Sequence, residues 1–332
     1  MFLKKDLGLL VLILVVGTIV ALINPRFLSP INLANTANLI GLFGLFSLGE
    51  GLVIITGGIE LSIGSVFALL GVIFVDLLVT YDVPWPLAIL ILIVAGTLIG
   101  LINGFLITRM RLQPFVVTLC GLLIYRGIAR YYTNDGTAGF AFGQSFPTLE
   151  WLTTGRSYGV PHSFIAFVLV AIAMAVLLHR SMFGRYLFAV GRNEEAARYS
   201  GIQTGRVVAA AYVMCGALAG LSSVFLTMYT RSISPASHGN FYELYGIAAA
   251  VLGGCSLRGG EGSIVGIVLG AILLQILQNL VNLLGIPSSL NFAVMGAVIL
   301  IGVLADQQFK EYRQWRMASR DSEAGKKKSQ DL

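Results

Sequence analysis

Charged residues are scarce in this chain. Asp, Glu, Lys and Arg make up 11% of the 332 residues, whereas hydrophobic residues make up 56%. Because soluble domains carry about 25% charged residues, this composition excludes a mainly soluble chain and predicts an integral membrane protein. Apolar runs recur over nearly the whole length, so we expect one membrane domain over residues 1–306. Seven of the 22 Lys and Arg lie in the last 23 residues, and we expect a disordered, basic cytoplasmic tail over residues 307–332.

Cysteine and histidine are equally rare, with three of each. The cysteines are odd in number and far apart in apolar sequence, which argues against a disulfide framework. The histidines make no metal-ligand spacing with them, so we predict no metal site. The sequence also lacks a GxxxxGKS/T phosphate-binding loop and an HExxH helix. We therefore predict a non-catalytic chain, and any nucleotide hydrolysis linked to it would occur on another polypeptide.

Ten apolar runs predict ten membrane-spanning helices in an all-α polytopic protein. A helix needs roughly 20 residues to cross a bilayer, and only the eighth run is clearly short of that length. With the N-terminus in the cytoplasm, 17 of the 22 Lys and Arg fall on the inner side, which satisfies the positive-inside rule. We therefore expect both termini in the cytoplasm. The predicted spans are residues 7–23, 39–55, 62–79, 87–107, 115–129, 163–178, 207–230, 244–252, 264–284 and 290–305.

The stretch 48–66, LGEGLVIITGGIELSIGSV, combines two carboxylates with a glycine break. Glu50 lies in the apolar run before Gly57-Gly58, and Glu60 follows the break. An ionisable side chain in a bilayer core costs about 2.5–3.5 kcal/mol, and a broken helix there must line protein or a cavity. Glu60 alone is compatible with an interfacial loop in water. The whole stretch favours a transport site, with candidate residues Glu50, Gly57, Gly58, Glu60, Leu61, Ser62, Gly64 and Ser65.

Four amide side chains form a stripe in the ninth predicted span. Gln275, Gln278, Asn279 and Asn282 follow the spacing i, i+3, i+4 and i+7, which places them on one face of a helix. Amides that face lipid would lack partners, so this face is expected against protein or water. Hydrogen bonding between helices and a polar pathway for a hydroxylated, uncharged solute explain the stripe equally well.

The inner segment 179–206 is the most charged internal part of the chain, and it contains signals for a short helix. Asn193 is a good N-cap, Glu194 and Glu195 suit the first turn, and Gly201 can close the helix in the left-handed conformation. A helix this short is marginal in isolation, so we expect it to bind a partner surface.

Four motifs resemble those of the permease subunits of bacterial ribose-type sugar importers of the ATP-binding-cassette (ABC) class. They cover nearly the whole chain in order: GGIELSIGS (57–65), FGRYLFAVGRNEEAARYSGI (183–202), YELYGIAAAVLGGCSLRGGEGSIVG (242–266) and QNLVNLLGI (278–286). The resemblance is specific to this family of sugar and branched-chain amino acid permeases, and it does not select one sugar.

The resemblance implies a ten-span permease of the same broad type (type II) as that of the cobalamin importer, in a bacterial inner membrane. Two permease copies, or this chain and a paralogue, would form the pathway at an interface near the amide stripe. Two ATPase subunits would hold ATP and Mg²⁺, so no cofactor is expected on this chain, and a periplasmic binding protein would deliver the solute. The resemblance also implies a coupling helix for the ATPase, with residues Gly191, Asn193, Glu194, Glu195, Ala197, Arg198 and Gly201.

Two residues depart from the family pattern. Glu60 stands where the family usually has Asp, and Glu50 stands where an apolar residue, commonly Met, is expected. Either change is compatible with a different substrate subgroup or with a paralogue that pairs with a second permease. The alternative from another class is a proton-coupled secondary transporter that uses Glu50 and Glu60. Within the ABC class, the solute could also be a furanose-like signal molecule, a nucleoside or a branched-chain amino acid.

Overall fold

The computed structural model describes residues 2–287, 290, 293, 294, 296, 297 and 300. The chain forms two compact units, Met1–Gly285 and Ile286–Leu332. The first unit is described below. Most of the tenth predicted span, 290–305, and the whole tail, 307–332, lie outside the described residues.

The described part is mostly helical, which confirms the all-α prediction at that level. Its α-helices are α1 (Phe2–Ile23), α2 (Pro30–Ile55), α3 (Ile63–Val79), α4 (Trp85–Thr108), α5 (Pro114–Tyr132), α6 (Pro147–Thr154), α7 (His162–Arg180), α8 (Met182–Arg192), α9 (Glu194–Tyr199), α10 (Thr204–Thr230), α11 (Tyr242–Leu252) and α12 (Ile264–Leu283). A 3₁₀ turn, η1 (Pro25–Leu28), precedes α2. Two short antiparallel pairs join β1 (Ala138–Gly139) to β4 (Ser232–Ile233) and β2 (Arg156–Ser157) to β3 (Val160–Pro161).

Each of the first nine predicted spans coincides with a helix, namely α1 to α5, α7 and α10 to α12. In the described residues, six of these helices are long and apolar enough to cross a membrane, and α3 and α11 are shorter apolar helices. Helix α2 begins at Pro30, before the predicted second span at 39–55, so the polar residues that lead into this span are also helical. Ser29 caps α2 by accepting a hydrogen bond from the Asn32 backbone N–H, and Pro30 occupies the first helical position, where its fixed φ suits a helix start.

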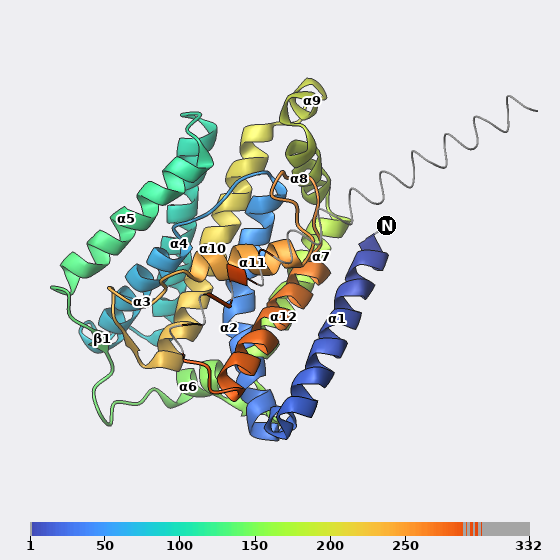
Figure 1. Cartoon of the computed structure of the whole chain (residues 1–332). Coiled ribbons are helices and arrows are strands. Elements are labelled where there is room, and N and C mark those ends of the chain that lie inside the picture. The colour runs from blue at the N-terminus through green and yellow to red at the C-terminus, as the bar shows by residue number, and fades with distance from the viewer. Residues whose placement is uncertain (1, 288–289, 291–292, 295, 298–299, 301–332) are drawn as a thin grey trace, which may run out of the picture. The chain divides into compact units, whose positions relative to one another are not determined.

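Helix α2 is the central element of the first unit. Every residue from Gly44 to Ile55 is buried, and α7, α10, α11 and α12 pack around it. Figure 1 shows α2 behind α11 and α12, with α8 and α9 at one end of this unit and α6 and β1 at the opposite end. The N-terminus of α1 lies toward the end that carries α8 and α9.

Glycines bring α4 and α10 into backbone contact. A Cβ added to Gly96 would lie 2.2 Å from the Gly216 carbonyl oxygen, and one added to Gly100 would lie 2.2 Å from the Tyr212 carbonyl oxygen. In lipid there is no hydrophobic driving force between helices, so a close backbone approach stabilises the pair through van der Waals packing. The four-residue spacing of Gly96, Gly100 and Gly104 places this contact surface on one face of α4.

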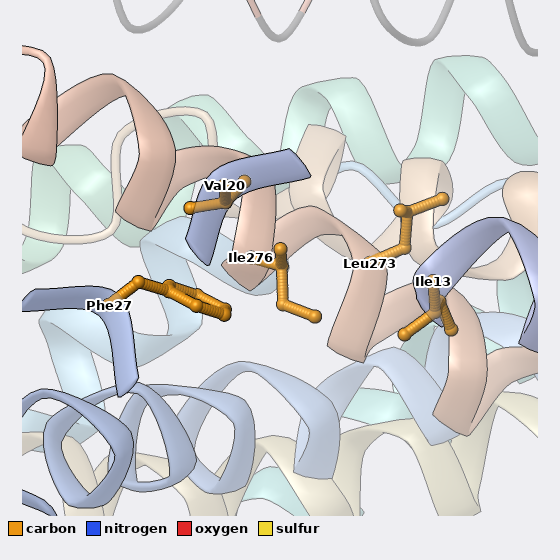
Figure 2. Packing of buried hydrophobic residues seen from close by; sticks show 5 residues of the cluster. All are labelled: Ile13, Val20, Phe27, Leu273 and Ile276. Carbon is orange, nitrogen blue, oxygen red and sulfur yellow. The ribbon is translucent and has the colours of Figure 1, made fainter. Parts of the chain in front are cut away.

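Helix α1 packs on one side only. Its Ile13 and Val20, with Phe27 of η1, are buried against Leu273 and Ile276 of α12 (Figure 2). Most of the other side chains over residues 6–23 are exposed; this window has a mean hydropathy of 2.8, and only 11% of it is buried. An exposed apolar surface of this kind is suited to lipid.

The segment 133–161, between α5 and α7, contains β1, α6 and the β2–β3 hairpin. At the other end of the unit, the segment 179–206 contains α8 as well as the predicted short helix α9.

Candidate functional site

The predicted glycine break separates α2 from α3 by seven non-helical residues, 56–62. Gly57 adopts φ +85°, a conformation that favours glycine. The Ile59 carbonyl accepts hydrogen bonds from the Tyr212 hydroxyl at 3.2 Å and the Thr118 hydroxyl at 3.3 Å. Neighbouring helices therefore satisfy the irregular backbone, as membrane depth requires. Gly58 leaves room for the Tyr212 hydroxyl, which would lie 2.6 Å from an added Cβ.

Glu60 is buried and fully hydrogen-bonded inside the protein. Its Oε1 accepts from the Ser62 backbone N–H at 2.7 Å and from the Ser62 hydroxyl at 2.5 Å, and its Oε2 accepts from Asn103 Nδ2 at 2.9 Å. The side chain is 5% exposed and borders a cavity of about 10 Å³ between α3, α4 and α10. The interpretation of Glu60 as an interfacial residue in open water is therefore wrong for this structure.

A second helix break, at residues 231–241, separates α10 from α11, in agreement with the gap between the predicted spans 207–230 and 244–252; its internal contacts were not predicted. Arg126 of α5 donates to the Pro235 carbonyl at 2.7 Å and to the His238 carbonyl at 2.5 Å. The ring Nδ1 of His238 accepts from the Ser234 backbone N–H at 2.8 Å. These contacts again satisfy irregular backbone from within the protein.

Gly64, in the first turn of α3 just after the first break, contacts Gly239 of the second break. A Cβ on Gly64 would lie 2.0 Å from the Gly239 carbonyl oxygen, and one on Gly239 would lie 2.1 Å from the Gly64 carbonyl oxygen. Glu243, in the first turn of α11, is 7% exposed, and its Oε2 would lie 2.7 Å from the same added Cβ on Gly64. Glu60 and Glu243 thus lie at the N-termini of α3 and α11, where the helix dipole favours negative charge.

Sequence reasoning missed Asn103, Tyr212, Arg126 and Glu243 as parts of this centre. Asn103 and Glu243 carried a usable signal, because each is a polar residue within or beside an otherwise apolar predicted span. The pairing of Arg126 with carbonyls more than 100 residues away depends on tertiary structure and has no local signal.

Glu50 lies in the buried part of α2, away from the break itself. Its side chain is 0% exposed, and neither carboxyl oxygen has a hydrogen-bond partner. It packs on the bare backbone of Gly246 in α11, where an added Cβ would lie 2.7 Å from Glu50 Cγ. Burial of an unpaired polar group costs about 1–3 kcal/mol by protein mutational data, so Glu50 is a stability liability in this state.

The amide stripe on α12 is divided between several environments. Asn279 and Asn32 of α2 exchange two hydrogen bonds, at 2.8 and 3.0 Å, and Gln278 Nε2 donates to the Tyr245 hydroxyl of α11. Asn282 is exposed. Gln275 is buried with its Oε1 unpaired. Bonding between helices therefore accounts for Gln278 and Asn279 within the chain, and it does not account for Gln275.

The short helix α9 has the predicted boundaries and caps. Asn193 Oδ1 accepts from the Ala196 backbone N–H at 2.9 Å, and Gly201 adopts φ +83°. Glu194 accepts hydrogen bonds from Arg198 at 3.1 Å and from the Thr204 hydroxyl at 3.0 Å, while Ala197 is buried. The exposed polar surface of α9 therefore includes the free carboxylate of Glu195 and the half-exposed Glu194–Arg198 pair.

Helix α8 joins α9 to the end of α2. A Cβ on Gly191 would lie 1.8 Å from the Ile55 carbonyl oxygen, which also accepts from the Gly260 backbone N–H at 2.8 Å. The last turn of α2, the α8 helix and the loop before α12 are therefore in direct backbone contact. The predicted partner-binding segment thus lies immediately beside the first helix break.

One hydrolase-like spacing, G-x-S-x-G at 155–159, occurs at the opposite end of the unit. Ser157 Oγ lies 2.7 Å from His162 Nε2, and His162 Nδ1 lies 2.5 Å from the Trp151 carbonyl oxygen. The motif in hydrolases requires a strand-to-helix turn and a carboxylate behind the histidine. Here the serine is in the β2–β3 hairpin and the histidine faces a carbonyl, so the arrangement does not match a catalytic triad.

Arg231 fixes the region around α6. It donates to Glu150 Oε1 at 2.5 Å and to the Gln144 carbonyl at 2.6 Å, and its guanidinium lies 5.1 Å from the Phe140 ring centroid. The Phe146 backbone N–H and then the Arg231 guanidinium lower the pKa of Glu150 below its usual value. This network holds the β1–β4 pair and α6 together.

The fold and these polar groups define a polytopic helical membrane protein with two internal helix breaks, an architecture typical of transport proteins. The model of the family "Branched-chain amino acid transport system / permease component" matches residues 32–303. The chain belongs to this permease family.

Relatives with similar sequences cover nearly the same length. The ribose import permease protein RbsC of Escherichia coli K12 is 37% identical over 305 residues, which are 92% of this chain and 93% of that protein. The RbsC protein of Bacillus subtilis 168 is 40% identical over 304 residues, 91% of each chain. The fructose import permease protein FruF of Bifidobacterium longum is 34% identical over 254 residues, 76% of this chain and 71% of that protein. No solved structure matches the chain.

Proposed function

We propose that this chain is the transmembrane subunit of an ATP-driven importer that carries a monosaccharide, or a similar small hydroxylated solute, across the bacterial inner membrane. The observation that carries the proposal is the near full-length similarity to two ribose import permeases and one fructose import permease. The centre at the two helix breaks is consistent with it, because discontinuous helices place polar groups at membrane depth.

ATP and Mg²⁺ would be held by separate ATPase subunits, and no cofactor is assigned to this chain. Helix α9 with its Glu194, Glu195 and Arg198 would bind a groove of the ATPase. The backbone contact between Gly191 and Ile55 would pass the resulting force to α2 and the first helix break. Both termini would lie in the cytoplasm.

Two permease chains, either identical or paralogous, would enclose the pathway. The polar atom of Gln275 that lacks a partner, and the exposed amide of Asn282, are available to a second copy or to solute at such an interface. A periplasmic binding protein would deliver solute at the end that carries α6 and the β2–β3 hairpin. The hallmark residues from Gly57 to Ser65, with Glu50, would lie beside the pathway.

A proton-coupled secondary transporter remains the second candidate, and one observation favours it. Glu50 is a buried carboxyl with no partner, and such groups inside membranes mark proton relays in pumps and transporters. The two candidates differ in what must be present for transport.

The test is uptake of tritiated sugars into proteoliposomes. The proposed function requires uptake only when the ATPase, the binding protein and ATP are all present, and none in vesicles that contain this chain alone. A panel of D-ribose, D-fructose, D-xylose and D-galactose covers the sugar class. Uptake by the chain alone, driven by an imposed pH gradient and unaffected by ATP, would contradict the importer and support the proton-coupled transporter.

A further inference from the structure

Aromatic side chains gather where α2 meets α3 and α11. Phe43 and Phe46 come from α2, Phe67 from α3, and Tyr242 and Tyr245 from α11. The ring centroid of Phe43 lies 5.0 Å from that of Tyr242 and 5.2 Å from that of Tyr245. Phe46 lies 5.0 Å from Phe67 and is nearly parallel to Tyr242, with 4° between the ring planes and 6.2 Å between the centroids.

This aromatic cluster borders a cavity of about 10 Å³. Leu42, Ser222 and Leu226 complete its wall. A cavity of about this size holds at most a single water molecule. Phe43 and Tyr242 are only partly buried, so the cavity lies close to the surface of the unit rather than at its centre.

Glu50 does not line the cavity itself, but it packs beside Phe46, one of the residues of the cavity wall. Glu50 lies one helical turn beyond Phe46 on α2, and Gly246 lies one turn beyond Tyr242 on α11. A Cβ added to Gly246 would lie 2.7 Å from Glu50 Cγ and 3.2 Å from the Phe46 ring, so both side chains pack on this glycine. The Glu50 side chain and the Phe46 side of the aromatic wall are therefore neighbours.

This combination matches the chemistry of a monosaccharide ring. One face of a sugar ring is rich in C–H groups, which carry partial positive charge and stack on the negative face of an aromatic ring. Its hydroxyls need a small number of placed polar groups, and a carboxyl accepts hydrogen bonds from hydroxyls strongly. A purely structural aromatic cluster would not need a buried carboxyl without a partner beside it.

We propose that the aromatic pocket and Glu50 form an intramembrane binding subsite for a monosaccharide, narrowed in this structure and widened when α2 and α11 separate during transport. The proposal rests on the function proposed above and extends it, because it places part of the sugar selectivity in the permease. The sugar ring would stack on Tyr242 and Phe46, and its hydroxyls would supply the hydrogen-bond partners that Glu50 lacks here.

The test uses the complete importer in proteoliposomes, with sugar uptake and ATP hydrolysis measured in parallel for the sugar that the wild type transports best. Tyr242→Leu removes the aromatic face and Glu50→Met removes the carboxyl, and we expect each to import about three- to tenfold less sugar per ATP hydrolysed. Tyr242→Phe retains the ring and should behave as the wild type. Phe164→Leu is the matched control, because Phe164 contacts Phe167 on α7 and does not border the pocket.

If a variant fails to assemble, chemical labelling of the wild-type importer tests the same proposal. Dicyclohexylcarbodiimide, a hydrophobic reagent for carboxyl groups, should label Glu50 in the importer, and saturating transported sugar should slow that labelling in the presence of a non-hydrolysable ATP analogue. Labelling that the sugar leaves unchanged with and without nucleotide would overturn the subsite, and so would wild-type coupling in Tyr242→Leu and Glu50→Met. In both cases the importer function would stand. Failure of the wild type to import any of the four sugars would instead contradict the proposed function.

Discussion

Replacement of Glu50 by methionine should stabilise the folded chain while it impairs transport. The carboxyl is 0% exposed, and both of its oxygens lack partners. Burial of a polar group without a hydrogen bond costs about 1–3 kcal/mol in mutational data. Methionine has a similar length and no polar group to satisfy, and it adapts to irregular gaps. We therefore expect Glu50→Met to raise the free energy of unfolding by about 1–3 kcal/mol.

The measurement is thermal unfolding of the purified chain in detergent, at one fixed scan rate because membrane-protein unfolding is often irreversible. A change of 1 kcal/mol shifts Tm by about 2–4 °C in chains of about 150–250 residues, so a rise of roughly 2–12 °C is expected. Glu50→Gln should give no such rise, since an amide also lacks partners at this position. Glu195→Met is the matched control, because Glu195 is exposed on α9.

A Tm for Glu50→Met that equals or falls below that of the wild type would refute the reasoning. It would mean that Glu50 has a compensating partner in the purified protein. A higher Tm together with reduced sugar import per ATP would be the pattern of a site that sacrifices stability for function.

Four further predictions concern packing, hydrogen bonding, pH and coupling. Gly100→Ala should destabilise the chain by about 1–3 kcal/mol, because its Cβ would lie 2.2 Å from the Tyr212 carbonyl oxygen; thermal unfolding measures this. Asn103→Leu should cost about 1–3 kcal/mol in the same assay, since it removes the donor to Glu60 Oε2. The pKa of Glu150 is lower in the folded chain than its unfolded value of 4.5, so the ionised carboxylate stabilises the fold. This stability is fully present above pH 4.5 and is lost as the pH falls through the lower folded pKa. Glu150→Gln should therefore remove this part of the acid destabilisation, which thermal melts across that pH range measure. Glu194→Lys combined with Glu195→Lys should abolish co-purification with the ATPase and leave the Tm of the isolated permease nearly unchanged.

Each of these has a contrary outcome, and Gly100→Ala also has a matched control. Gly127→Ala is the control for Gly100→Ala, because nothing lies within 4 Å of an added Cβ there, and equal effects would contradict the close packing of α4 on α10. An unchanged Tm for Asn103→Leu would show that Glu60 does not need this donor. An identical acid profile for Glu150→Gln and wild type would exclude a role for that carboxylate. Normal transport by the double lysine variant would refute the coupling assignment of α9.

The membrane helices could be predicted from sequence because each depends on a local apolar run. The first nine predicted spans all correspond to helices, and the caps of α9 follow from Asn193 and Gly201. Boundaries were less certain, since the polar residues after Pro30 lowered the hydropathy of a segment that is nevertheless helical. The first helix break was visible from Gly57-Gly58 and its neighbouring acids.

The partners within the site could not be predicted in the same way. Glu60 was identified as a candidate site residue. In its buried position, however, its Oε2 accepts a hydrogen bond from Asn103, which lies 43 residues further along the chain. The second break has no glycine pair beside an acid at its start, and its backbone is satisfied by Arg126 from a helix far away in sequence. Glu50 was identified as an anomaly from its place in an apolar run and its departure from the family pattern, whereas its lack of any partner became known only from the packing of α2 on α11.

Helix α2 connects the proposed sugar subsite to the proposed ATPase contact. Phe46 and Glu50 lie on it, and its last residue, Ile55, touches Gly191 of α8 and Gly260 before α12 through backbone atoms alone. Backbone contacts of this kind have no side chain that can change rotamer and absorb a displacement. A shift of α8 and α9 would therefore displace the end of α2 directly, and the glycine contact at Gly246 is where α2 could slide past α11. On this basis, Gly191→Ala should uncouple ATP hydrolysis from sugar import even though residue 191 contacts neither nucleotide nor solute, and unchanged coupling in that variant would show that α2 does not carry the signal.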